Sequence, residues 1–310
     1  MLDVPSPPAA PPRARGPAGT WATTGLAAIA PVTWGTTYLV TTQWLPPDRP
    51  LLSGVLRALP AGLIALAIGR RLPHGVWWWR AVVLGTLNIG AFFVLLFIAA
   101  YRLPGGVAAT LSAVQPLVVA GLALPLLRES PSPWRLGWGV VGVVGVAMMV
   151  LRGRLGFDLA GLLAGLAATT VMAAGTVLAK RWGRPPGVGA LAFAGWQLTA
   201  GGLLIVPFAL AVEGVPPALD APALAGYAWL SLVGTGLAYT LWFTGLGRLP
   251  VTAMSFLPLL SPAVAAVLGW ALLGQSLTPG QLVGFGLALI AIGTAQLNPH
   301  LRTNRTERKS

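Results

Sequence analysis

The side chains of this sequence that are best suited to chemistry are aromatic rings placed inside apolar stretches. Trp34, Tyr38 and Thr41 share one face of a predicted helix, because positions i, i+4 and i+7 lie on the same side. Tyr239 and Trp242 form a second aromatic pair. Rings with a polar edge bind planar, amphipathic molecules through stacking and single hydrogen bonds. We therefore expect these residues to line a binding cavity, with packing between helices as the alternative interpretation.

Three neutral amides, Asn88, Gln115 and Gln197, lie deep inside other apolar stretches. A buried amide in such a stretch needs hydrogen-bond partners, and either a bound molecule or a neighbouring helix can supply them. The sequence leaves this choice open. The candidate binding residues are Trp34, Tyr38, Asn88, Ser112, Gln115, Gln197, Tyr239, Trp242 and Ser255. The weaker candidates are Ser261, Thr170, Thr176 and Pro258.

One charged residue, Arg57, falls inside an apolar stretch, roughly 9 Å from its end by helix rise. A charge at this depth indicates a functional role by default. The alternative is that its long side chain reaches back to the membrane surface. Prolines inside apolar helices remove backbone donors and can kink the helix. Arg57, Pro116 and Pro262 are therefore candidates for gating or coupling, together with Glu129 at the end of an apolar stretch.

No arrangement of residues in the sequence is typical of a catalytic or metal centre. Cysteine is absent, and both histidines, His74 and His300, lie outside the apolar stretches. All seven acidic residues fall in loops, tails or helix ends, whereas proton relays in membranes use buried carboxylates or histidines. We predict no catalytic residues, no metal, no cofactor and no proton coupling through a buried carboxylate. Coupling at a helix-end acid such as Glu129 remains open.

The elements that must position these residues are long and apolar. Hydrophobic residues make up 55% of the chain and charged residues 9%, and the mean hydropathy is +0.77. Because soluble domains carry about 25% charged residues, this composition indicates a polytopic membrane protein. The net charge of +13 does not indicate nucleic-acid binding, because the sequence shows no basic face or motif for it. Ten spans are predicted, with approximate boundaries 22–44, 51–69, 81–101, 104–127, 136–151, 159–179, 188–212, 222–246, 250–273 and 279–297.

Positive charge is unevenly distributed among the loops between these spans. When alternate loops are assigned to opposite sides, one side carries most of the Lys and Arg residues, and both termini lie on it. The positive-inside rule therefore predicts a multi-pass protein of the cytoplasmic membrane with both termini in the cytoplasm. Residues 1–20 read as a disordered Pro/Ala-rich tail and residues 298–310 as a basic tail.

An internal repeat organises the spans. Residues 102–136 and 248–282, which are 146 positions apart, are identical at 13 of 35 positions. The loop charges place the two copies on opposite sides, so each repeat contains an odd number of spans. We predict an all-α integral membrane fold of ten transmembrane helices, built as two inverted five-helix repeats over residues 21–152 and 153–297. A weaker match, 140 positions apart, aligns Gly62 with Gly202 and Arg57 with Gln197.

Several segments resemble one membrane family. They are TWGTTYLV at residues 33–40, LRALPAG at residues 56–62, and the proline-containing fourth and ninth spans. The chain is similar over about residues 22–297 to the EamA-type ten-helix exporters of the drug/metabolite transporter superfamily. WGTTYLVTTQWLPPDRP and AAYRLPGGVAATL resemble its subgroup of pigment and amino-acid-metabolite exporters.

The resemblance extends to single positions of the fourth helix of each repeat. Pro116 and Pro262 match the family's proline, and Glu129 matches the acidic residue at the helix end. In the second repeat Gln275 stands where the family usually has Glu. A role that needs a charge at both positions is therefore in doubt.

The resemblance implies export. We hypothesise a secondary transporter that exports a small amphipathic metabolite, amino-acid-like, aromatic or pigment-like, by alternating access. Its expected partners are that substrate and the lipid bilayer, with no nucleic acid, and the chain is expected to be a monomer or a weak dimer. The competing hypotheses are an integral-membrane enzyme acting on a lipid-linked substrate and a scaffold without a cavity.

Overall fold

The computed structural model of the chain describes residues 17–103, 111–130, 132–150, 158–216, 218–274 and 278–296. The predicted basic tail and most of the predicted N-terminal tail lie outside these ranges, as does Gln275. A helix already begins at Pro17, ahead of the predicted first span, because proline favours the first turn of a helix.

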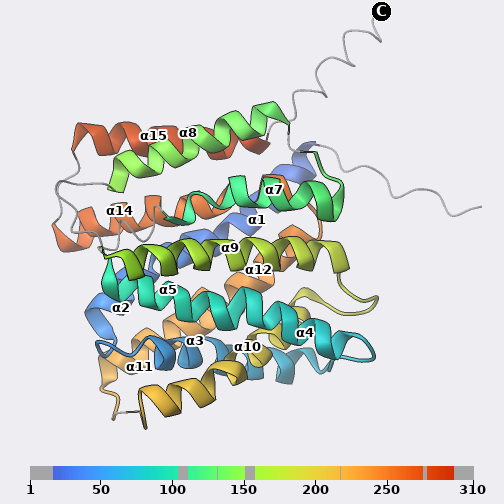
Figure 1. Ribbon diagram of the computed structural model, residues 1–310, viewed down its shortest axis with the longest axis vertical. Helices are drawn as coiled ribbons and strands as arrows, with labels where there is room; N and C mark the ends of the chain where they lie inside the picture. Colours follow the sequence, from blue (N-terminus) through green and yellow to red (C-terminus); the bar gives the residue numbers. More distant parts are fainter. Residues whose placement is uncertain are drawn as a thin grey trace, which may run out of the picture.

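The described part of the chain contains helices and no strands. The helices lie side by side with nearly parallel axes, from α8 and α15 at one edge to α3, α10 and α11 at the other (Figure 1). The elements are α1 (Pro17–Gly35), α2 (Thr37–Trp44), α3 (Pro50–Gly69), α4 (Trp77–Gly85), η1 (Thr86–Gly90), α5 (Ala91–Arg102), α7 (Gln115–Leu127), α8 (Pro133–Val150), α9 (Leu159–Trp182), α10 (Ala190–Val212), α11 (Ala221–Ala228), η2 (Trp229–Leu237), α12 (Ala238–Leu246), α13 (Val251–Met254), η3 (Leu257–Leu259), α14 (Leu260–Leu273) and α15 (Pro279–Gln296).

Six stretches of the described residues are long and apolar enough to cross a membrane. They are Pro50–Gly69, Trp77–Arg102, Leu159–Trp182, Ala190–Val212, Ala221–Leu246 and Val251–Leu272. Two shorter apolar helices are Gln115–Leu127 and Leu282–Ala295. The chain is thus helical and of the membrane type, while the count of ten spans stays a prediction.

The main helix contacts join the first half of the chain to the second. Helix α3 packs along α10, and α8 packs along α15. Helix α5 contacts α9 while α1 contacts α12, and α7 contacts α9 while α1 contacts α14. Exchanging the two halves leaves the contacts α3–α10 and α8–α15 as they are. It converts α5–α9 into α1–α12 and α7–α9 into α1–α14.

Glycines allow the closest of these approaches. A Cβ atom at Gly62 of α3 would lie 2.6 Å from the backbone nitrogen of Thr199 in α10. A Cβ atom at Gly202 of α10 would lie 3.0 Å from the Cβ of Leu59 in α3. The aligned glycines Gly62 and Gly202 therefore serve the same crossing from opposite sides, and neither position has room for a larger residue.

Several helices are interrupted within the bundle. The π-helical turns η1 and η2 lie inside the predicted third and eighth spans, and both are followed by regular helix. The predicted first span is broken at Thr36, between α1 and α2. Turns also precede α7, at residues 113–114, and follow α13, at residues 255–256. Such interruptions leave backbone groups available and commonly occur at functional sites.

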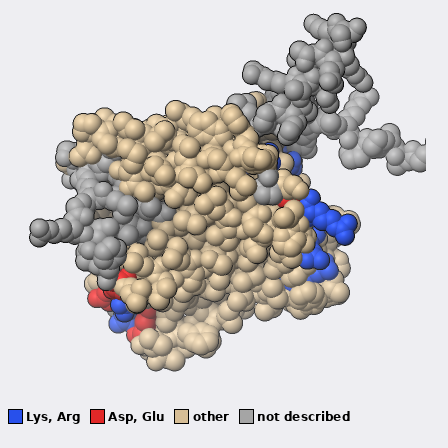
Figure 2. Space-filling model, turned by 45° about the horizontal axis from the view of Figure 1, so that its top comes forward, with Lys and Arg blue, Asp and Glu red and all other residues tan. Residues whose placement is uncertain are grey.

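One end of the bundle, here named the basic end, carries mainly positive charge (Figure 2). The loop after α3 reaches it, where the Trp196 indole donates to the Arg71 carbonyl oxygen at 2.7 Å. The Arg80 guanidinium lies 5.3 Å from the ring centre of Trp182, at the end of α9. This end holds the loops that the sequence assigns to the cytoplasm.

The opposite end, the mixed end, pairs acids with bases. Arg102 forms an ion pair with Asp158 at 3.2 Å, and Arg49 donates to the Glu213 carbonyl oxygen. The hydrogen bond from the Gly161 amide, followed by the charge of Arg102, lowers the pKa of Asp158. Asp158 also caps the N-terminus of α9 through that amide, at 2.9 Å.

Candidate functional site

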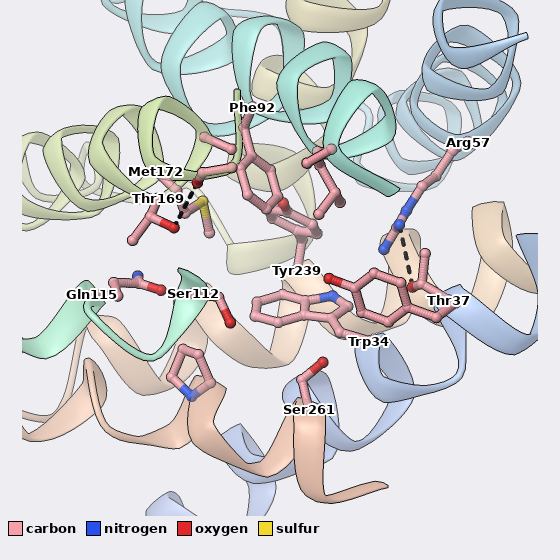
Figure 3. Close-up of a pocket in the computed structure, with 16 residues that line it drawn as sticks. Trp34, Thr37, Arg57, Phe92, Ser112, Gln115, Thr169, Met172, Tyr239 and Ser261 are labelled. Carbon is pink, nitrogen blue, oxygen red and sulfur yellow. Dashed lines mark hydrogen bonds between the residues drawn. The ribbon is translucent and has the colours of Figure 1, made fainter. Parts of the chain in front are cut away.

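A cavity of about 70 Å³ lies among helices from both halves of the chain (Figure 3). Its volume corresponds to on the order of five water molecules. Six of the candidates proposed from the sequence line it: Trp34, Tyr38, Arg57, Ser112, Gln115 and Tyr239. The weaker candidates Pro258 and Ser261 also line it.

Aromatic rings form one wall of this cavity. Trp34 of α1 lies with its ring centre 5.4 Å from that of Tyr239 and 5.3 Å from that of Trp242, both in α12. The Trp34 indole donates to the Gly234 carbonyl oxygen of η2 at 3.0 Å, so the ring is fixed in orientation. Trp242 is fully buried behind Trp34 and does not line the cavity. The wall therefore contains Trp34 from the first half and Tyr239 from the second, and Trp242 packs behind Trp34.

Arg57 reaches the cavity from α3 and is 2% exposed. Its Nε donates to the Thr235 hydroxyl at 3.0 Å, and its two terminal nitrogens donate to the Thr37 hydroxyl at 3.3 Å and the Gly234 carbonyl oxygen at 3.4 Å. The guanidinium carbon also lies 4.7 Å from the ring centre of Phe93. The side chain thus points among α2, α5 and η2 and is buried within the bundle.

Asn88 and Gln197 bond to each other outside the cavity. The Asn88 side-chain nitrogen donates to Gln197 Oε1 at 2.8 Å, and Gln197 Nε2 donates to the Phe193 carbonyl oxygen at 3.2 Å. The Tyr239 hydroxyl in turn donates to the Asn88 carbonyl oxygen at 3.2 Å. A Cβ at Gly175 would lie 2.1 Å from Asn88 Oδ1, so only glycine fits there. This arrangement joins η1 to α10 and holds the cavity residue Tyr239.

Gln115 is the first residue of α7, directly after the turn at residues 113–114. Pro116 follows it, and proline is favoured at this place because its missing N–H costs no helical hydrogen bond there. The Gln115 side chain lines the cavity, and its Nε2 has no hydrogen-bond partner within the described ranges. An unused buried donor at a cavity wall is suited to a ligand acceptor or a water molecule.

Three further candidates lie apart from the cavity lining. Ser255 is buried, and its hydroxyl donates to the Thr252 carbonyl oxygen at 2.9 Å. Pro262 is buried near the start of α14, on the helix that carries the lining residue Ser261. Pro116 is likewise buried in α7.

Glu129 is half-buried at the basic end, just after α7. It is close enough to interact electrostatically with Arg135 and Lys180. Lys180 donates to the carbonyl oxygens of Leu246 at 2.8 Å and Leu249 at 2.7 Å, where it caps α12. Glu129 therefore belongs to the charged surface of the basic end and not to the cavity.

A second pocket, of about 380 Å³, opens at the basic end. Lys180, Arg184, Phe193 and Phe243 are among the residues that line it. The rings of Phe193 and Phe243 meet edge to face at 5.2 Å, and Phe243 lies 5.9 Å from Tyr239 of the central cavity. A continuous row of rings therefore runs from the basic-end pocket to the cavity.

The sequence did not single out several residues of the cavity lining, among them Thr37, Phe92, Thr169 and Met172. Residues of these types are ordinary in apolar helices, so composition carries no signal for them. The Thr169 hydroxyl donates to the Leu111 carbonyl oxygen at 3.1 Å and holds the segment before α7 against α9. Only the packing of α9 reveals which of its residues face inward.

The described residues contain no three His, Asp or Glu side chains close enough to share a metal ion. No Asp or Glu is buried within the described ranges. Among the described residues, the cavity is thus lined by neutral polar groups, aromatic and apolar side chains, and a single charged side chain, Arg57. Such a lining is suited to holding a small molecule and not to acid–base or metal chemistry.

Comparison with known proteins gives a consistent result. The model of the EamA-like transporter family matches residues 22–151 and 159–295. Protein PecM of Dickeya dadantii is 48% identical over 255 residues, which cover 82% of this chain and 86% of that protein. A probable amino-acid metabolite efflux pump of Salmonella typhimurium is 26% identical over 301 residues, 92% of this chain and 97% of the pump.

One solved crystal structure of a protein is also similar. It has a TM-score of 0.74 and 20% sequence identity, covering 88% of this chain and 97% of that chain. At this level of identity the likeness shows the fold alone.

Proposed function

This chain belongs to the EamA-like transporter family, and we propose that it exports a small amphipathic metabolite across the cytoplasmic membrane by alternating access. Membrane transport of small molecules follows from the family and its named relatives. The substrate class, the cycle and the orientation are our proposal. The observation that carries it is an aromatic cavity to which both halves of the chain contribute, as expected at the interface between transporter repeats.

The symmetric exchange of helix contacts supports two inverted five-helix repeats, over residues 21–152 and 153–297. Each half supplies one helix to every main contact, and the π-helical turns occur in the corresponding third and eighth spans. In transporters of this design, one half rocks against the other around a fixed site. The aligned glycines Gly62 and Gly202 sit at the crossing of α3 and α10, where such halves meet.

The sizes of the two pockets support an alternating cycle. Ligand pockets usually enclose about 300–1,000 Å³, and the central cavity, at about 70 Å³, is smaller than this. The basic-end pocket, at about 380 Å³, is large enough and is separated from the cavity by Phe193 and Phe243. We propose that substrate enters from the basic end, which faces the cytoplasm, when these rings move apart.

The cavity lining and the named relatives support one class of substrate. Trp34 and Tyr239 offer a flat apolar surface, and Gln115 offers an unused donor. A molecule with an aromatic or apolar body and one polar end satisfies both. The named amino-acid metabolite efflux pump among the relatives suggests an amino-acid-like substrate.

The test is efflux from proteoliposomes or vesicles with a panel of amino acids, aromatic acids and pigments. Trp34→Ala removes one aromatic face of the cavity and should lower flux about fivefold, since stacking of one ring on the substrate contributes on the order of 1 kcal/mol. Trp270→Ala is the matched control, because Trp270 is 55% exposed on α14 and lies outside the cavity lining. Flux of none of the compounds by the unmodified chain would contradict the proposal.

The same assay tests coupling. Because no carboxylate is buried in the described residues, we expect flux to persist without a pH gradient. A strong dependence on the gradient that disappears in Glu129→Gln would instead assign coupling to the basic end.

A further inference from the structure

The charge of Arg57 has no carboxylate partner in the described part of the chain. Its contacts are two hydroxyls, one carbonyl oxygen and an aromatic ring. The one ion pair among the described residues joins Arg102 to Asp158 at the mixed end. A buried charge inside a membrane protein is costly and usually pairs with an opposite charge. The protein thus holds an uncompensated positive charge at the wall of its cavity.

The Arg57 guanidinium also has N–H donors that its contacts in the described residues do not use. Arginine carries five N–H groups, and the structure gives the Arg57 side chain three acceptors. The third contact, to Gly234, is long at 3.4 Å. Figure 3 shows the guanidinium beside Thr37 and the rings that line the cavity. A carboxylate accepts two parallel hydrogen bonds from such a fork and supplies the missing charge.

The rest of the cavity restricts what such an anion can be attached to. The lining next to Arg57 is aromatic, from Trp34, Tyr38 and Tyr239, and the described residues add no other charged side chain to it. A dianion or a phosphate ester would leave charge unmatched against these rings. A molecule with a single carboxylate and an apolar or aromatic body matches both parts of the cavity.

From this geometry we infer that Arg57 binds the carboxylate of the transported molecule, so that the substrates are amphipathic carboxylates. This inference rests on the proposed transport function and adds the charge requirement to it. Arg57 then acts as a substrate-binding residue, and the ligand carboxylate becomes its counter-ion. The apolar body of the ligand lies against Trp34 and Tyr239.

The test measures binding to the purified full-length chain by thermal unfolding, with matched ligand pairs. The pairs are 3-phenylpropionate with 3-phenylpropionamide, and L-phenylalanine with L-phenylalaninamide, while acetate tests a simple anion. A ligand that binds only the folded state raises the unfolding temperature. We expect at least one aromatic carboxylate to bind about tenfold or more tightly than its amide, which lacks the charge. Acetate should bind far more weakly than the aromatic acids.

Substitutions identify the residue responsible. Arg57→Gln should abolish the preference for carboxylate over amide, and Arg57→Lys should keep part of it, because lysine retains the charge without the fork. The matched control is Arg102→Gln, which removes one arginine at the mixed end and should leave the preference intact. If Arg57→Gln does not fold, the lysine variant alone decides, since a weakened but persistent preference is expected of it.

Several outcomes would overturn the inference. Equal binding of acids and amides, no stabilisation by any carboxylate, or stabilisation by acetate as strong as by the aromatic acids would each do so. An unchanged preference in the Arg57 variants would also do so. Transport of amides as fast as acids would refute this inference and leave the proposed function standing. Carboxylate-specific binding without transport of any compound would support the role of Arg57 and contradict the proposed function.

Discussion

Arg57 in α3 and Gln197 in α10 occupy aligned positions in the two halves, and their surroundings differ in a simple way. Arg57 donates to Gly234 and Thr235 of η2, whereas Gln197 accepts from Asn88 of η1. Asn88 lies in η1 and Gly234 and Thr235 lie in η2, the π-helical turns of the third and eighth predicted spans. Each residue therefore reaches the π-helical turn of the opposite half.

The difference between these two places is chemical. The amide of Gln197, from the second half, is hydrogen-bonded to the amide of Asn88 from the first half, and this pair lies away from the cavity. The charged side chain of Arg57, from the first half, faces Gly234 and the Thr235 hydroxyl. It lines the cavity and keeps unused N–H donors. A duplicated fold thus supplies two equivalent positions, of which one joins helices and the other is available to a ligand.

The largest expected effect comes from making the two positions alike. Gln197→Arg places a second buried charge beside Asn88, where no carboxylate lies among the described residues. We expect a loss of stability of about 3 kcal/mol, the cost of a charged side chain in a membrane helix. Thermal unfolding of the purified protein measures it. Gln197→Met is the control, since it removes the hydrogen bonds without adding charge and should cost only about 1 kcal/mol.

An unchanged unfolding temperature in Gln197→Arg would mean that both halves tolerate a charge equally well. The contrast between the two positions would then lie in the residues alone and not in their surroundings.

A smaller effect is expected where α3 crosses α10, the two helices that carry Arg57 and Gln197. Gly62→Ala would bring a Cβ within 2.6 Å of the backbone nitrogen of Thr199, whereas at Gly202 the nearest atom is the Cβ of Leu59 at 3.0 Å, with backbone atoms of Leu59 at 3.1 Å. Overpacking usually costs about 1–3 kcal/mol, and we expect Gly62→Ala to be the more destabilising because its approach is the closer of the two. Unfolding temperatures and flux of both variants check this. Equal losses would indicate that the crossing adjusts symmetrically.

The smallest effect concerns the amide pair itself. Asn88→Ala removes one buried hydrogen bond and leaves Gln197 Oε1 without a donor, which should cost about 1 kcal/mol. Because Asn88 does not line the cavity, the preference for carboxylates over amides should stay as it is. A lost preference with normal stability would instead place Asn88 in the binding site, as the sequence first suggested.

Sequence reasoning found those cavity residues whose types are unusual inside an apolar helix. Trp34, Tyr38, Arg57, Gln115 and Tyr239 stand out for that reason, and all of them line the cavity. It could not separate them from residues of the same types that face a neighbouring helix. Periodicity shows which residues share a face of one helix, but not what that face meets.

The buried polar residues illustrate this limit. Asn88 and Gln197 are amides like Gln115, yet they bond to each other, and Trp242 packs behind Trp34. Thr37 and Thr169 gave no signal at all, since threonine is common in membrane helices. Their contributions depend on helices far apart in the sequence.

The sequence by itself determined the membrane class, the apolar segments, the duplication and the family resemblance. These properties follow from the order of residues alone, because hydropathy and internal similarity do not depend on which residues meet in space. Only the tertiary structure decided that Arg57 meets Thr37, Gly234 and Thr235, with no carboxylate beside it in the part of the chain that the structure describes. The rotation of each helix about its axis is set by packing against its neighbours, and that rotation decides which polar groups are paired and which are available to bind a ligand.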